Sequence, residues 1–221
     1  DGFLNITGTP SLEEVWKDIV DLDKVDCIYG HIPYGIHNYF PKDISCKYVT
    51  FLREPVDRLL ALFYFNKNVW DLEEVDFSKG NIKEIMNLLS QYSYADLDNG
   101  MTRTLGGFEE RFVEKITSFV TEDDYNLALK NLSTFYFVGL VENIETSRTR
   151  MFTKSIKALG KKLNWSHIPK EVKIHYYPNR ISSKDLSLLD LERIRGTQVY
   201  DSELWYVAKK INKELCNEWI Y

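Results

Sequence analysis

The hydrophobic pattern of the chain predicts strands that alternate with helices. Short apolar runs at Cys27–Tyr29, Tyr48–Leu52 and Phe135–Leu140 have the length and the β-branched or aromatic content of buried strands. Between and after them, apolar residues recur at helical spacing from Pro55 to about Asn66 and from Ile144 to Leu159. This alternation predicts an α/β fold with a mostly parallel central sheet flanked by helices.

Shorter stretches with helical spacing or a capping signal predict further helices. Ser11-Leu-Glu-Glu14 resembles a capping box that opens a helix to about Val20. Asp98-Asn-Gly100 is a turn signal, and residues 67–80 are expected to form a loop. The other predicted helices are Ile82–Leu89, Asp123–Leu132, Ser187–Arg195 and Asp201–Trp219.

The amino-acid composition limits the number of domains, the binding partners and the cellular compartment to be expected. The 221 residues, 44% of them hydrophobic, are expected to form one domain over residues 1–221. No apolar run approaches the ~20 residues needed to cross a bilayer. The net charge of −5 argues against nucleic acid or a polyanionic polysaccharide as a major partner, while a local basic pocket stays open. The cysteines Cys27, Cys46 and Cys216 lack metal-ligand spacing, which favours a reducing, cytoplasmic setting.

The turn after the second predicted strand carries the most specific chemical signal. Arg53 occupies this turn, Pro55 suits the first position of the following helix, and Arg58 lies one turn further on. Such a turn binds phosphate when helix N–H groups face the anion and a guanidinium supplies a fork of donors. The alternative is that Arg53 pairs with Glu54 or Asp57 in an ordinary α/β core. The local pattern leaves both interpretations open.

Arg53-Glu-Pro-Val-Asp-Arg58, after a strand and before an aromatic run, resembles a known phosphate motif. It is similar to the 3′-phosphate-binding motif of sulfotransferases that use 3′-phosphoadenosine 5′-phosphosulfate (PAPS). The resemblance is to the carbohydrate and uronyl 2-O-sulfotransferase group and its bacterial-type members, and it covers nearly the whole chain. It implies a P-loop-NTPase-like three-layer sandwich, PAPS as co-substrate, adenosine 3′,5′-bisphosphate (PAP) as product, and no metal. It also implies that Arg53 holds the 3′-phosphate, with Arg58 supporting it or paired with Asp57.

Two histidines follow the first predicted strand in Gly30-His31-Ile-Pro-Tyr-Gly-Ile-His37, where ligands gather in open α/β sheets. A histidine there can act as a general base, although a loop histidine is also a common hydrogen-bonded turn residue. In the 2-O-sulfotransferase group, the histidine of a corresponding Gly-His deprotonates the acceptor hydroxyl, so the resemblance assigns this role to His31. His37 is expected to bind or position the substrate. A metal site formed by the two is rejected, because no carboxylate or cysteine cluster completes it.

Later segments resemble the same family. Asp98-Asn-Gly-Met-Thr-Arg-Thr-Leu-Gly106 matches a segment of bacterial members, and Asn99 and Arg103 are expected to line the acceptor side of the cleft. The alternative is a turn and helix start with Arg103 on the surface. Phe137-Val-Gly-Leu-Val-Glu142 resembles the family's Val-Gly-Leu-Thr-Glu strand end, with Glu142 as an orienter of a nearby cation.

Tyr177-Pro-Asn-Arg-Ile-Ser-Ser-Lys184 resembles the loop that closes over the nucleotide in relatives. From this loop, Arg180 and Lys184 either reach the phosphates or are solvated loop charges, and both interpretations stay open.

The chain departs from the family pattern at two places. The family usually has a serine eight residues after the motif's first arginine, where its hydroxyl shares the 3′-phosphate, and here that residue is Ala61. Losing one hydrogen bond to a charged group costs roughly 1.5–3 kcal/mol, unless Ser45, Thr50 or a residue of the late loop substitutes. The sequence also lacks a Pro-Lys-Thr-Gly-Gly-Thr-like loop, which in relatives cradles the 5′-phosphosulfate. We therefore expect this loop and its N-terminal strand to precede the sequence or to be supplied separately.

The sequence therefore predicts a PAPS-dependent sulfotransferase that acts on a hydroxyl of a saccharide or small-molecule acceptor. His31 would be the base and Arg53 would bind the 3′-phosphate. The alternative is a non-catalytic sulfotransferase-like domain that binds a nucleotide or a partner, which Ala61 and the missing loop favour. A kinase ranks last, because no Asp-Phe-Gly or comparable cluster is present. No nucleic acid partner is expected, and a homo-oligomer is left open.

Overall fold

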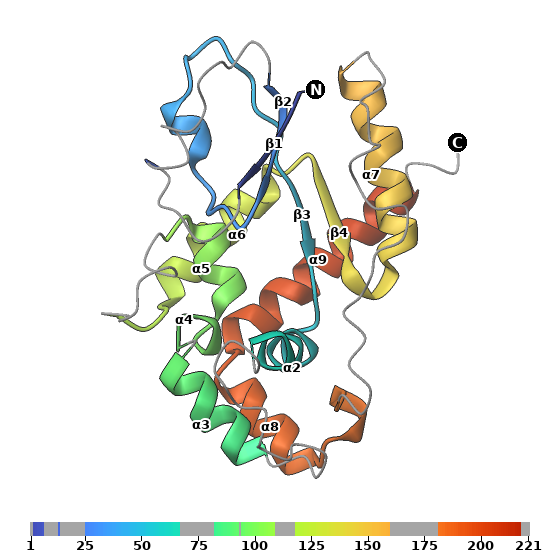
Figure 1. Cartoon of the computed structure of the whole chain (residues 1–221). Coiled ribbons are helices and arrows are strands. Elements are labelled where there is room, and N and C mark those ends of the chain that lie inside the picture. Colours follow the sequence, from blue (N-terminus) through green and yellow to red (C-terminus); the bar gives the residue numbers. More distant parts are fainter. Residues whose placement is uncertain are drawn as a thin grey trace.

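The computed structural model describes residues 2–6, 13, 25–66, 82–92, 94–108, 118–159 and 181–217. Within them, strands pair in parallel in two places, and helices lie beside one of these strand pairs (Figure 1). The α/β prediction is confirmed at this level. The loop expected at 67–80 lies outside the described residues, as does the helix expected after Ser11, except for Glu13, which is helical.

The central strand pair joins β3 (Val49–Leu52) to β4 (Phe137–Leu140) in parallel register. Both strands were predicted from their apolar runs. Gly139 stands opposite Phe51 in the pair, and a Cβ atom added to it would lie 2.6 Å from the phenylalanine ring. A glycine at this point of β4 therefore lets the aromatic ring lie directly over the neighbouring backbone.

A second parallel pair joins β1 (Gly2–Ile6) to β2 (Val25–Gly30). β2 contains the predicted strand Cys27–Tyr29. β1 was not predicted, because its short run with a polar Asn5 becomes recognisable as a strand only through its pairing with β2. In the described part of the chain the two pairs form separate sheets.

The helices follow the predicted periodicity closely. α2 (Pro55–Asn66) and α7 (Ile144–Leu159) have the predicted bounds. The remaining α-helices are α3 (Ile82–Tyr92), α4 (Tyr94–Leu97), α5 (Gly100–Gly106), α6 (Glu122–Ser133), α8 (Leu188–Gly196) and α9 (Val199–Asn217). Short 3₁₀ helices occur at η2 (Ile36–Tyr39), η4 (Val141–Asn143) and η6 (Ser183–Asp185).

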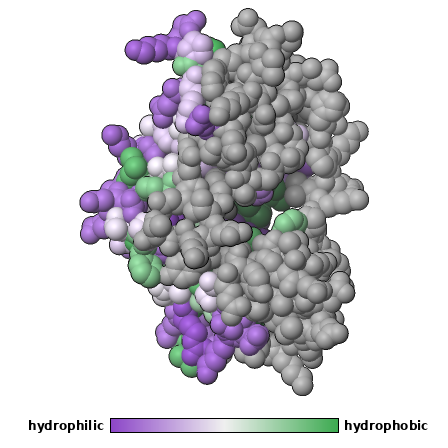
Figure 2. Space-filling model, turned by 60° about the vertical axis from the view of Figure 1, so that its left-hand side comes forward, coloured by the Kyte–Doolittle hydropathy of each residue, from purple (hydrophilic) through white to green (hydrophobic). Residues whose placement is uncertain are grey.

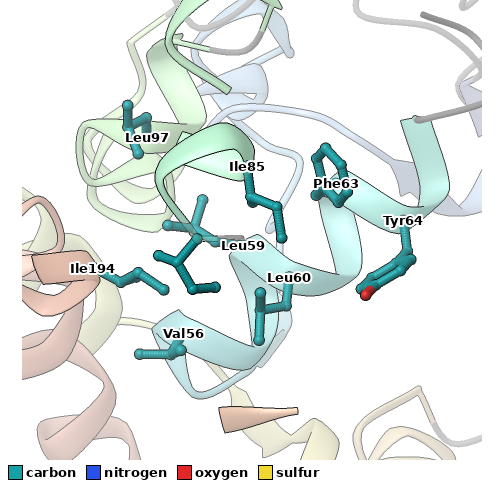
Figure 3. Close-up of a cluster of buried hydrophobic side chains, with 9 residues drawn as sticks. Val56, Leu59, Leu60, Phe63, Tyr64, Ile85, Leu97 and Ile194 are labelled. Carbon is teal, nitrogen blue, oxygen red and sulfur yellow. The ribbon is translucent and has the colours of Figure 1, made fainter. Parts of the chain in front are cut away.

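One hydrophobic cluster holds α2 against α3, α4 and α8 (Figure 3). Its α2 members recur at helical spacing, so they form one apolar face of the helix. Because three other helices cover this face, the start of α2 is fixed at the end of β3. The buried members are Val56, Leu59, Leu60, Phe63, Tyr64, Ile82, Ile85, Leu97 and Ile194.

A second cluster joins β3 and β4 to α5, α6 and α9. Figure 1 shows α9 and α7 beside the strand pair, with α2 at the end of β3. The buried members of this cluster are Leu52, Met101, Leu105, Ala128, Leu132, Val138, Leu140, Leu204 and Ala208.

The described surface is mainly polar on the face shown in Figure 2, where hydrophobic side chains form small separate groups among hydrophilic ones. Among the helices that the structure describes, none combines the length and apolar character of a membrane span.

Candidate functional site

Three segments that are distant in the sequence meet where β3 ends and α2 begins. Arg53 lies half-buried between the two elements. Parallel pairing brings the end of β4 alongside, and Glu142 in η4 accepts a hydrogen bond from the Glu54 N–H through Oε1. From the C-terminal part of the chain, the Ser183 N–H in η6 donates to Asp57 Oδ1 at 2.9 Å. We call this meeting point the β3–α2 junction.

Backbone N–H groups engage all three carboxylates of the junction. Besides the bonds to Glu142 and Asp57, Glu54 Oε2 accepts the Asp57 N–H at 2.8 Å. The side chain of Glu54 therefore caps α2 itself, whereas one of the two sequence interpretations had the N–H groups of this turn face an external anion. Burial raises the pKa of Glu54 above its ordinary value, while the hydrogen bond from Asp57 and the charge of Arg195 act in the opposite direction.

The cationic side chains of the junction, in contrast to its carboxylates, lack hydrogen-bonding partners among the described residues. None of the ion pairs or hydrogen bonds among the described residues involves the side chains of Arg53, Lys184 or Arg195. The pairing of Arg53 with Glu54 or Asp57, which the sequence left open, is thus not observed. Lys184 is exposed beside Ser183, and Arg195 is exposed in the last turn of α8. Arg195 comes near Glu54 through the packing of α8 against α2, which no local sequence pattern reveals.

Arg58 has a different role from the one suggested by its place in the motif. Its guanidinium forms an ion pair with the Asp96 carboxylate and donates to the Asp96 carbonyl at 3.3 Å. It also fills the space beside Gly100, where an added Cβ would lie 2.6 Å from Nη2. Its partner is thus Asp96 rather than Asp57, and its contacts link α2 to α4 and α5.

Asn99 and Arg103, expected to line the acceptor side of a cleft, lie in the interior. Arg103 is only 2% exposed, so the alternative that placed it on the surface is wrong. Its guanidinium pairs with the Asp98 carboxylate and donates to the Asp98 carbonyl at 3.0 Å and the Ser118 carbonyl at 2.7 Å. Asn99 has a left-handed φ of 55°, and its Oδ1 accepts the Asp201 N–H at 3.1 Å. Because these contacts are with the protein itself, we do not carry a substrate-binding role for either residue into the proposed function.

Asp201 is the residue of this network that the sequence did not reveal. Its completely buried carboxylate accepts the Met101 N–H at 2.9 Å, the Thr102 N–H at 2.7 Å and the Thr102 hydroxyl at 2.8 Å. The first turn of α9 thereby caps the first turn of α5. The partners are about a hundred residues apart in the sequence, and no local pattern signals such a contact.

The two histidines occupy different surroundings. His31 follows β2 directly and is exposed. His37 lies in η2, where its Nδ1 is 2.7 Å from the Tyr48 hydroxyl. Tyr48 precedes β3 and Arg53 follows it, so the strand separates them by about 16 Å at ~3.3 Å per residue. The structure therefore does not bring His37 to the β3–α2 junction.

Arg180 lies outside the described residues. In the described ranges, no three His, Cys, Asp or Glu side chains are grouped so that they could hold a metal ion. Comparison with protein-family models, curated proteins and solved structures finds no match to this chain.

Proposed function

We propose that the protein is a PAPS-dependent sulfotransferase, which transfers a sulfuryl group to a hydroxyl of a saccharide or small-molecule acceptor. In this proposal the 3′-phosphate binds at the β3–α2 junction, and the fold is the three-layer sandwich of that family. The order of strand, Arg53 turn and helix supports the proposal, as does the position of His31 immediately after a parallel strand.

The observation that carries the proposal is the state of Arg53. The two other arginines that the sequence marked as candidate site residues and that the structure describes, Arg58 and Arg103, each pair with a carboxylate. Arg53 is half-buried without such a partner among the described residues, while the neighbouring Glu54 bonds to a backbone N–H. Because removing a charge from water is unfavourable without compensation, the arrangement favours an anion from outside the protein as the partner of Arg53.

In this proposal the residues of the junction would hold part of a PAPS molecule. Arg53 would hold the 3′-phosphate, and Lys184 would approach it from η6. Ala61 lies in α2 without the hydroxyl that relatives use, so the phosphate loses one partner there. PAPS, when bound, supplies the sulfuryl group. The imidazole of His31 would take the proton of the acceptor hydroxyl.

Replacing Arg53 by alanine is expected to weaken PAP binding about 10- to 100-fold, because charged hydrogen bonds contribute about 1.5–3 kcal/mol. Calorimetric titration of PAP into wild-type protein and the variant measures this loss. Arg193→Ala removes an exposed arginine of α8 that pairs with Asp190 and serves as the control, with affinity unchanged. Equal PAP affinity in Arg53→Ala and wild type would remove Arg53 from the site.

Replacing His31 by glutamine is expected to lower sulfuryl transfer by about 100-fold or more while PAP affinity stays the same, because general-base catalysis contributes roughly 10²–10⁴. Transfer is followed with radiolabelled PAPS and a panel of mono- and oligosaccharides. The assignment fails if His31→Gln retains full turnover with an acceptor that the wild-type protein uses.

A non-catalytic nucleotide-binding domain is the second candidate, and Ala61 favours it. The same titration and transfer assays separate the two functions. PAP binding that depends on Arg53, without transfer to any acceptor of the panel, would support the binding domain over the enzyme.

A further inference from the structure

We propose that Tyr48 fixes the imidazole of His37 as a hydrogen-bond donor, which presents its Nε2–H to an oxygen atom of the acceptor substrate. The inference rests on the proposed function only for the identity of that ligand. Its structural basis is a hydroxyl that contacts three nitrogen atoms of the same turn. The Tyr48 hydroxyl lies 3.3 Å from the Gly35 backbone nitrogen, 3.2 Å from the His37 backbone nitrogen and 2.7 Å from His37 Nδ1.

Counting donors and acceptors settles the direction of the shortest contact. Two of the three nitrogens are backbone N–H groups, which only donate, so they occupy the two lone pairs of the hydroxyl oxygen. The hydroxyl retains one proton and has one neighbour left to receive it, His37 Nδ1. Nδ1 therefore accepts, and the proton of the neutral ring lies on Nε2. The opposite assignment would give the oxygen three donors and leave its own proton without an acceptor.

The surroundings keep the Tyr48 phenol protonated and hold the imidazole in place. Burial raises the pKa of the Tyr48 phenol, and the backbone hydrogen bonds from His37 and Gly35 act against this shift, so the hydroxyl keeps its proton near neutral pH. The rings of Tyr34 and Tyr48 pack edge-on to the imidazole, with centroids 5.3 and 5.4 Å away. These contacts fix the plane of the ring, and the hydrogen bond from Tyr48 selects its tautomer.

The second ring nitrogen of His37, Nε2, determines what the residue can bind. Nε2 has no hydrogen-bond partner in the part of the chain that the structure describes. A nitrogen that carries a proton has no free lone pair, so it cannot remove a proton from a hydroxyl. It can donate to an oxygen of a sugar or alcohol. His37 is then a binding residue and Tyr48 a positioning residue, which leaves His31 as the general base.

Long-range ¹H–¹⁵N correlation spectra of the imidazole rings test the inference on the intact chain, without nucleotide or acceptor. At about pH 8.5, where an ordinary histidine is neutral, His37 is expected to show the pattern of a ring protonated at Nε2. His37→Gln identifies its signals by their loss. In Tyr48→Phe the Nδ1 resonance is expected to move toward the value of a pyridine-type nitrogen without a hydrogen bond, and the Nδ1–H form to become populated.

Tyr136→Phe provides the matched control. It removes a tyrosine hydroxyl at the same end of the strand pair, where the hydroxyl donates to the Lys154 carbonyl, and the His37 signals are expected to stay unchanged. A His37 ring protonated at Nδ1 in the wild type overturns the inference. So does an unchanged Nδ1 resonance in Tyr48→Phe with a native backbone spectrum. Neither result depends on PAP binding, so failure of the proposed sulfotransferase function is detected separately by the Arg53 titration.

Discussion

Replacing Arg103 by methionine is expected to lower the free energy of unfolding by about 3–5 kcal/mol, the cost of breaking a buried ion pair by removing one partner. Methionine keeps much of the side-chain volume but leaves the Asp98 carboxylate and the Ser118 carbonyl without the guanidinium. The Asp98 side chain is only 13% exposed, so water replaces the lost bonds poorly. Urea denaturation followed by circular dichroism measures the change.

A surface ion pair gives the control for this substitution. Arg193→Met breaks the 3.2 Å contact to Asp190, where the arginine side chain is 38% exposed, and the expected loss is below about 1 kcal/mol. The double variant Asp98→Asn/Arg103→Met is expected to be more stable than Arg103→Met alone, because it no longer buries an unpaired charge. An Arg103→Met variant as stable as Arg193→Met would contradict an interior structural role and return Arg103 to the ligand-binding candidates.

Replacing Asp201 by asparagine is expected to lower the free energy of unfolding by about 3 kcal/mol, because an NH₂ group then faces a buried N–H at α5 and leaves that N–H without an acceptor. Equilibrium denaturation measures the change. Asp124→Asn is a close chemical match at the surface, since Asp124 also accepts the N–H and hydroxyl of one threonine, Thr121. Its expected cost is about 1 kcal/mol, so a larger loss in Asp124→Asn than in Asp201→Asn would contradict the prediction.

The cost of Asp201→Asn is also expected to depend on pH. Burial raises the pKa of Asp201 above its ordinary 3.8, while Arg58 and the hydrogen bonds from α5 act in the opposite direction. The folded protein therefore binds this proton more tightly than the unfolded chain does. The contribution of the carboxyl to stability is complete below pH 3.8 and declines as pH rises to the raised pKa. Asparagine does not titrate, so the stability difference between wild type and variant should shrink over this range. A difference that grows with pH would contradict the raised pKa.

The arginines of the β3–α2 junction illustrate how far the sequence could predict the candidate site. The motif from Arg53 to Arg58 was visible in the sequence, together with the strand before it and the helix after it. The sequence did not reveal which arginine of this motif stays available for a ligand. The pairing of Arg58 with Asp96 links residues 38 positions apart, and the placement of Arg195 at the junction depends on how α8 packs on α2. Local patterns carry no information about such long-range partners.

The sequence by itself determined the secondary structure over most of the described chain. Hydrophobic periodicity and Pro55 set the bounds of α2, and apolar runs gave β3 and β4, because these signals depend on near neighbours alone. Only the tertiary structure decided that β1 is a strand, that Asn99 and Arg103 are interior, and that Arg53 lies half-buried without a carboxylate partner among the described residues. The physical reason is that burial and charge pairing are properties of packed elements. Whether an arginine pairs with a carboxylate of the protein or stays available for a ligand is decided only when the chain has folded around it.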